Sequence, residues 1–111
     1  MLRAILGDIT FNFEKLETFP EYITSSTTLS LNRAHSVFWV QTGGGVVTLT
    51  LPPARNNYGQ FVNIRRESGA NNVVIVPSGS DTINGGSSLT LTLVNEAYTL
   101  ISDGDTKWGI M

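Results

Sequence analysis

The chain has 111 residues and a mass of 12.0 kDa, which corresponds to one domain with a modest hydrophobic core. Hydrophobic residues make up 41% of the chain and charged residues only 14%, the opposite of the balance found in disordered segments. The formal net charge of -2 disfavours nucleic acid as the main partner. The absence of cysteine excludes disulfides, thiolate metal sites and cysteine nucleophiles.

Residues 1–26 differ in composition from the rest of the chain, because they hold six of the sixteen charged side chains and three of the five phenylalanines. The alternation of Ile9, Phe11 and Phe13 suits a strand, whereas the residues before Asp8 suit one helical turn. We predict an N-terminal arm over residues 1–26 and a β domain over residues 27–111, with an ordinary first strand of the same sheet as the alternative. No apolar run is long enough to span a bilayer as a helix, so we expect neither a transmembrane helix nor a membrane partner.

From residue 28 onward, short apolar runs alternate with turn clusters rich in glycine, asparagine and proline. The predicted strands cover residues 28–31, 37–41, 46–51, 61–65, 73–76, 88–93, 98–102 and 107–110. Runs of this length and spacing predict an all-β fold, an antiparallel β-sandwich or barrel-like domain of about eight short strands.

Two kinds of strand pattern are present in this domain. In residues 48–51 and 89–93 leucine alternates with threonine, so the leucines are expected in the core and the threonines against solvent or a neighbouring chain. Residues 73–76 are apolar on both faces, which indicates either a central strand or a subunit interface.

The titratable residues do not form a recognisable catalytic or metal-binding pattern. His35 is the only histidine, and its neighbour Ser36 points to the opposite face of a strand. The spacing of the carboxylates selects no acid–base pair, and residues 103–105 are typical of a β-turn held by aspartate side chains. We therefore expect no catalytic residue, cofactor or metal site.

The arginines and aromatic residues leave two alternatives open. Of Arg65 and Arg66, one side chain is expected in solvent and the other paired with Glu67 or across a subunit boundary. The aromatic residues are expected to cap the core at strand ends, with a sugar-stacking platform as the alternative. They are Phe38, Trp39, Tyr58, Phe61, Tyr98 and Trp108.

A longer pattern covers the chain from about Thr28 to the end. It comprises Thr48–Pro52, Gly59 before Val62–Ile64, Val73–Pro77, Gly79–Gly85, Leu89–Leu91, Leu100–Gly104 and the closing Trp108. In this order of elements the chain resembles a β module of tailed-phage virion proteins, found in tail fibres, spikes, head fibres and head decoration proteins. In the pattern, Ile83 anchors a turn in the core, Gly85 allows a tight return and Trp108 closes the end of the sheet. Three residues separate Gly104 from Trp108 where such modules often have about two, which implies a longer final hairpin loop.

The resemblance implies a non-enzymatic virion protein, commonly a homotrimer. The leading hypothesis is a capsid decoration (cement) or head-fibre protein on the capsid surface, with the major capsid protein or another virion protein as partner. The apolar side chains of the arm would then contact the capsid or a neighbouring subunit. They are Leu2, Ile5, Ile9, Phe11, Phe13, Leu16, Phe19 and Tyr22.

Three alternatives to this hypothesis stay open. The first is a tail-associated protein, such as a short tail fibre, tip or baseplate component, which binds a host surface glycan or another tail protein. The second is a spike domain that degrades polysaccharide, and the third is a non-viral adhesion module.

Overall fold

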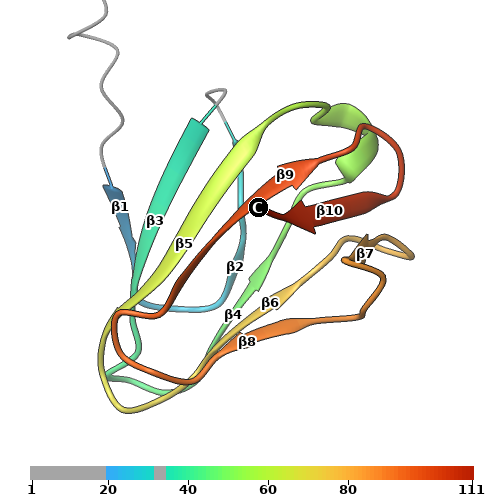
Figure 1. Cartoon of the computed structure of the whole chain (residues 1–111). Helices are drawn as coiled ribbons and strands as arrows, with labels where there is room; N and C mark the ends of the chain where they lie inside the picture. Colours follow the sequence, from blue (N-terminus) through green and yellow to red (C-terminus); the bar gives the residue numbers. More distant parts are fainter. Residues whose placement is uncertain (1–19, 32–34) are drawn as a thin grey trace, which may run out of the picture.

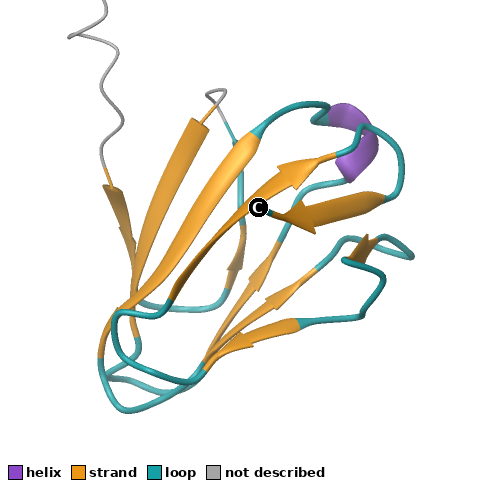
Figure 2. Cartoon of the chain, in the orientation of Figure 1, coloured by secondary structure: helices purple, strands orange, loops and turns teal. Residues whose placement is uncertain are grey.

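The computed structural model describes residues 20–31 and 35–111, which form strands and one short 3-10 helix (Figures 1 and 2). The first strands are β1 (Pro20–Ile23), β2 (Thr27–Thr28), β3 (His35–Gln41), β4 (Val47–Thr50), β5 (Phe61–Ser68) and β6 (Val73–Val76). They are followed by β7 (Thr82–Ile83), β8 (Leu89–Leu91), β9 (Ala97–Ser102) and β10 (Lys107–Ile110). The 3-10 helix η1 (Ala54–Asn56) precedes β5. The predicted all-β class is confirmed.

The strands form two mixed sheets that face each other across the core (Figure 1). The six-stranded sheet has the order β1-β3-β5-β9-β10-β7, and the four-stranded sheet has the order β2-β4-β6-β8. From β1 to β6 successive strands alternate between the sheets, so that neighbours within each sheet run parallel. The chain therefore winds through a solenoid-like arrangement.

The more detailed prediction of an antiparallel sandwich or barrel is wrong for this reason. The connection between β3 and β4 and the connection between β5 and β6 carry the chain to the facing sheet, whereas a hairpin would return it beside the strand that it left. Antiparallel pairing occurs where the later strands close the structure, between β5 and β9, β6 and β8, and β9 and β10. The β9–β10 pair is the final hairpin that the sequence predicted, with residues 103–106 as its loop.

In two successive turns of the solenoid, paired residues have the same separation in the sequence in both sheets. Val37 of β3 pairs with Asn63 of β5, and Val47 of β4 pairs with Val73 of β6. The partners are equally far apart in the sequence in both pairs. The register slips by one residue between Val40 and Gln41, and the connections that follow restore it before β4 and β6 begin. The pairing of β3 with β5 and the pairing of β4 with β6 thus share one sequence separation, although the chain has no matching sequence repeat.

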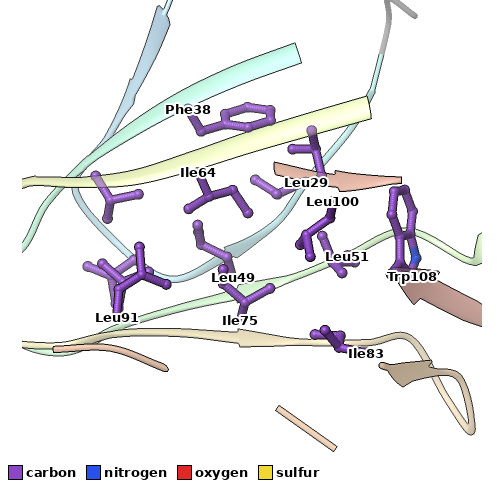
Figure 3. Packing of buried hydrophobic residues seen from close by; sticks show 14 of the residues in the cluster. Leu29, Phe38, Leu49, Leu51, Ile64, Ile75, Ile83, Leu91, Leu100 and Trp108 are labelled. Carbon is purple, nitrogen blue, oxygen red and sulfur yellow. The ribbon is translucent and has the colours of Figure 1, made fainter. Parts of the chain in front are cut away.

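The hydrophobic core lies between the sheets and follows the alternation of each strand (Figure 3). The fully buried side chains include Leu49, Ile64, Ile75, Leu91 and Leu100, which come from five different strands of the two sheets. In β6, Val73 and Ile75 are buried, whereas Val74 and Val76 are half-buried on the outer side. The strand lies between β4 and β8, which is the central position that was one of the two alternatives predicted from its apolar sequence.

One end of the core is closed by three residues of the phage-like pattern. Ile83 is buried, and Gly85 adopts a φ of 86°, a left-handed conformation that favours glycine. The Trp108 side chain is fully buried, and its indole N–H donates to the carbonyl oxygen of Pro52 at 3.2 Å. These positions agree with the predicted anchor, return and closing roles.

At the other end of the stack, β1 and β2 are the edge strands of the two sheets. Four residues of the predicted arm, Pro20–Ile23, form β1 and pair in parallel with β3. A hollow of about 190 Å³ opens at this end, where Ile23, Leu29 and Phe38 line it together with Glu21. Residues 1–19, which include the predicted strand over residues 9–13, lie outside the described part of the chain.

The connections after β3 and β5 are joined through Thr42 and Gly69. The buried Thr42 hydroxyl donates to the carbonyl oxygen of Asn71 at 2.7 Å, and the Asn71 amide donates to the Thr42 carbonyl oxygen at 2.7 Å. Gly69 has a φ of 97°, and a Cβ atom there would lie 2.6 Å from the Thr42 hydroxyl oxygen. This approach of two loops explains why residue 69 is a glycine.

Candidate functional site

The predicted contact residues of the arm fall almost entirely outside the described part of the chain. Leu2, Ile5, Ile9, Phe11, Phe13, Leu16 and Phe19 all precede residue 20. Tyr22 is described, and it lies on β1 with 54% of its surface exposed. Its ring meets the ring of Trp39 edge to face, with centroids 5.8 Å apart and an interplanar angle of 89°.

Tyr22 belongs to a surface that we call the aromatic face, the outward side of the six-stranded sheet formed by Tyr22, His35, Trp39, Phe61 and Arg65. The register places Tyr22 opposite Trp39 and Trp39 opposite Arg65, so the three side chains form a row across β1, β3 and β5. The Arg65 guanidinium lies 5.0 Å from the Trp39 ring centroid, within the range of a cation–π interaction. His35 and Phe61 form a second pair, with centroids 5.8 Å apart.

The polar side chains around the aromatic face are paired with one another. Gln41 donates to Glu67 at 3.3 Å, and Asn63 donates to the Thr99 hydroxyl at 2.8 Å. Arg65 donates to the side-chain oxygen of Asn95 at 2.7 Å. Cross-strand pairs of this kind stabilise the sheet itself.

The six aromatic residues considered as a sugar platform are separated by the fold. Phe38 and Trp108 point into the core. The Tyr98 hydroxyl donates to Glu96 at 3.0 Å, and Tyr58 lies on a loop with 79% of its surface exposed. Trp39 and Phe61 alone among the six share the aromatic face. His35 is exposed there, and Ser36 lies on the opposite side of the strand, as the alternation predicted.

The two adjacent arginines have different environments. Arg65 is on the aromatic face, whereas Arg66 is 4% exposed and points inward. The Arg66 guanidinium donates to the carbonyl oxygens of Thr92 and Gly69, the latter at 2.8 Å. It therefore links the β5–β6 and β8–β9 connections, and the predicted pairing with Glu67 does not occur. Strand alternation alone is sufficient to predict that one arginine points inward.

The outward side of the four-stranded sheet forms a second surface, which we call the uncharged face. It consists of Thr28, Thr48, Thr50, Val74, Val76 and Thr90. One row crosses the sheet through Thr28, Thr50 and Val76, and another through Thr48, Val74 and Thr90. These include the threonine positions that the leucine–threonine alternation placed on the outside.

A polar hollow of about 300 Å³ lies among the loops near the closed end of the core. Arg55 and Asp105 face each other across 4.0 Å at its rim, and both side chains are largely exposed. Asp81 lines the hollow and accepts the backbone N–H of Ala54 at 3.0 Å. Within residues 20–31 and 35–111, no three metal-ligating side chains gather into a site.

Two further carboxylates hold backbone turns. Asp103 accepts the backbone N–H groups of Asp105 and Lys107 at 2.8 and 3.0 Å, and the first of these bonds does most to lower the pKa of the carboxyl. Glu96 accepts the N–H groups of Leu93 and Thr92, and its pKa is lowered chiefly by the bond from Leu93. The turn predicted at residues 103–105 is thus confirmed, with Asp103 as the residue that organises it.

No protein-family model matches this chain, and no curated protein matches it significantly. Among the described residues, no helix has the length and apolar character needed to cross a membrane. The two outer faces of the domain and the phage-like pattern are therefore the features that bear on function.

Proposed function

We propose that this chain is a non-enzymatic structural protein of a tailed-phage virion, a homotrimeric capsid decoration (cement) or head-fibre protein on the capsid surface. Its partners are further copies of itself and the major capsid protein or another virion protein. Attachment in this role needs no chemical step, because it proceeds by burial of surface between neighbouring proteins.

The observation that carries the proposal is the placement of the phage-like pattern in the fold. Ile83, Gly85 and Trp108 form the closed end of the core, in the roles that the resemblance assigned to them. The residues of the pattern therefore have structural roles in this fold, which supports the use of the pattern to propose the class of protein.

The hydrogen bonds of the carboxylates support a non-enzymatic role. Asp81, Glu96 and Asp103 accept backbone N–H groups, and Glu67 accepts the Gln41 amide. Each of these groups contributes to loop or sheet structure. A glycoside hydrolase requires two carboxylates in a common cleft that act on the substrate. Asp81 and Asp105 both line the polar hollow, but Asp81 accepts the Ala54 backbone N–H and Asp105 faces Arg55.

The edge position of β1 supports attachment through the N-terminal arm. Residues 1–19 join the sheet at Pro20, on its outermost strand and next to the exposed Tyr22. An attachment segment before Pro20 would therefore be joined to the domain at a sheet edge.

The test is rebinding to phage particles that lack this protein. The full chain is expected to sediment with the particles, and a variant without residues 1–18 is expected to stay in the supernatant. The variant retains β1, so its circular dichroism and unfolding midpoint should match those of the full chain. Full binding by the truncated protein would contradict attachment through the arm. Absence of binding by the full chain, or gold labelling of tails only, would overturn a capsid role.

A second candidate is a tail-associated protein that binds a host surface glycan or another tail protein. It is favoured by the aromatic face, where Trp39 and Phe61 both lie on the outer side of the six-stranded sheet, because aromatic rings stack on the apolar faces of sugars. Binding on a glycan array that is lost in Trp39→Ala and kept in Tyr58→Ala would support this candidate. Tyr58 is a suitable control because it is an exposed aromatic residue away from the face.

A further inference from the structure

We propose that the uncharged face is the surface through which copies of this chain pack against one another. This inference rests on the proposed function, which requires self-association, and it goes further by assigning the contact to one side of the molecule. The occupant of the face is a second copy of the same chain.

The distribution of charge over the two sheets is the first argument. In the described strands, acidic, basic and histidine side chains occur on the six-stranded sheet, and the four-stranded sheet has none. On the six-stranded sheet, Glu21 and Arg66 lie on the inner side, whereas His35, Arg65, Glu67 and Lys107 lie on the outer side. The two outer faces of the domain thus differ sharply in charge.

Symmetry makes this difference relevant to self-association. Near a symmetry axis, each side chain faces the same side chain of another copy. A charged residue there would meet its own charge, which opposes association strongly when the groups are close and desolvated. The net charge of -2 adds repulsion between copies. Of the two outer sheet faces in the described part of the chain, the uncharged face is therefore the one on which identical copies can meet without opposing like charges.

The side chains of the uncharged face are suited to such a contact. Val74 and Val76 lie at the centre on β6, and threonines on β2, β4 and β8 surround them. An apolar centre with a polar rim is the usual composition of a protein interface. Both residue types are β-branched, so little rotamer freedom is lost when they are ordered.

The hydrogen bonding of the sheet favours contact between faces. β4 and β6 each have a strand on both sides, so the backbone groups beneath the uncharged face are already paired. Three copies that meet there would each direct Val74 and Val76 toward the common axis.

The aromatic face contrasts with this surface. Its polar side chains are bonded to one another, and the Arg65 guanidinium lies over Trp39. Two aromatic faces brought together would oppose Arg65 to its own copy and would disturb these pairs. Self-association is therefore assigned to the uncharged face alone.

The test compares two valines on central strands of opposite sheets. Val74 is half-buried on the uncharged face, and Val37 is half-buried on the outer side of β3. Native mass spectrometry of the full chain at low micromolar concentration should give three times the 12.0 kDa mass of one chain. We expect Val74→Glu to raise the dissociation constant by at least about tenfold, because it opposes like charges at the contact, and Val37→Glu to leave it unchanged.

Two controls keep the test decisive. Thr50→Glu is a second variant on the uncharged face, used if circular dichroism shows that Val74→Glu does not fold. Added salt should strengthen association of the natural chain only slightly, because its net charge is small, and should partly restore association of a folded glutamate variant.

The outcomes separate this inference from the proposed function. A natural chain that stays monomeric at high concentration, or association that Val37→Glu disrupts and the uncharged-face variants do not, would overturn the inference. Association through this face by a chain that fails to bind particles would support the inference and overturn the proposed capsid role. Binding to particles by a strictly monomeric chain would overturn the inference and support the proposed capsid role.

Discussion

The strands from β1 to β6 and those from β8 to β10 reach one core by different routes. In the first part, the chain crosses between the sheets at every connection, and each strand pairs in parallel with the next strand but one along the chain. In the second part, β8, β9 and β10 pair in antiparallel fashion and close the sheets. We call these the coiled part and the closing part.

The comparison shows that the two parts depend on different kinds of residue. The coiled part depends on the register between strands far apart in the sequence, which is fixed by buried side chains such as Leu49 and Ile75 and by loop contacts such as Thr42 with Gly69. The closing part depends on local turns held by carboxylates, as at Glu96 and Asp103. Substitutions at these sites should therefore have different costs.

The largest effect is expected where the two parts meet. Trp108 is on β10 in the closing part, and its indole N–H donates to Pro52 in the coiled part. Trp108→Ala removes a fully buried ring and leaves a cavity, so the free energy of unfolding should fall by about 3–5 kcal/mol. Urea denaturation measures the loss. The half-exposed Trp39 is the control, and an equal loss in Trp39→Ala would contradict the closing role of Trp108.

A medium effect is expected at the loop contact of the coiled part. In Gly69→Ala the new Cβ atom would clash with Thr42, at a left-handed φ that disfavours alanine. The free energy of unfolding should fall by about 1–3 kcal/mol. Gly43→Ala is the matched control, because residue 43 has no positive φ and no neighbour within 4 Å of the added atom. A change in Gly43→Ala as large as that in Gly69→Ala would refute the contact.

The smallest effect is the pH dependence of the closing part. The folded protein holds the pKa of Glu96 below its usual value of 4.5, so its contribution to stability is present above that value. It should be lost as the pH falls through the lowered pKa. The loss should not exceed about 1 kcal/mol, because the carboxylate is exposed to solvent. Unfolding midpoints from pH 7 to pH 3 should fall less in Glu96→Gln than in the natural chain, and identical pH profiles would contradict this role.

The sequence predicted the strands better than their pairing. The runs over residues 73–76 and 107–110 match β6 and β10 residue for residue. Alternation of apolar and polar residues is the same in parallel and antiparallel strands, so it carries no information on direction. A glycine-rich turn such as residues 43–45 indicates where the chain turns and not which sheet it enters. The short strands β1 and β7 were missed because neither has a long apolar run.

The outer faces were predictable to different degrees. The alternation over residues 48–51 placed the threonines of the uncharged face outside, because that alternation lies within single strands. The row of Tyr22, Trp39 and Arg65 depends on the registers between parallel strands that are far apart in the sequence. No local pattern encodes such registers, so the aromatic face became visible only with the fold.

Because paired residues have the same sequence separation in β3–β5 and in β4–β6, one turn of the chain is a unit by which the protein can be lengthened. Duplication of residues 35–60 would insert one complete rung into both sheets, keep both registers and lengthen the stack by about 4.8 Å. An insert of another size would shift one register against the other unless a loop absorbed the difference. Such a domain can be lengthened during evolution, or by design, in discrete steps that leave the closing strands and Trp108 unchanged.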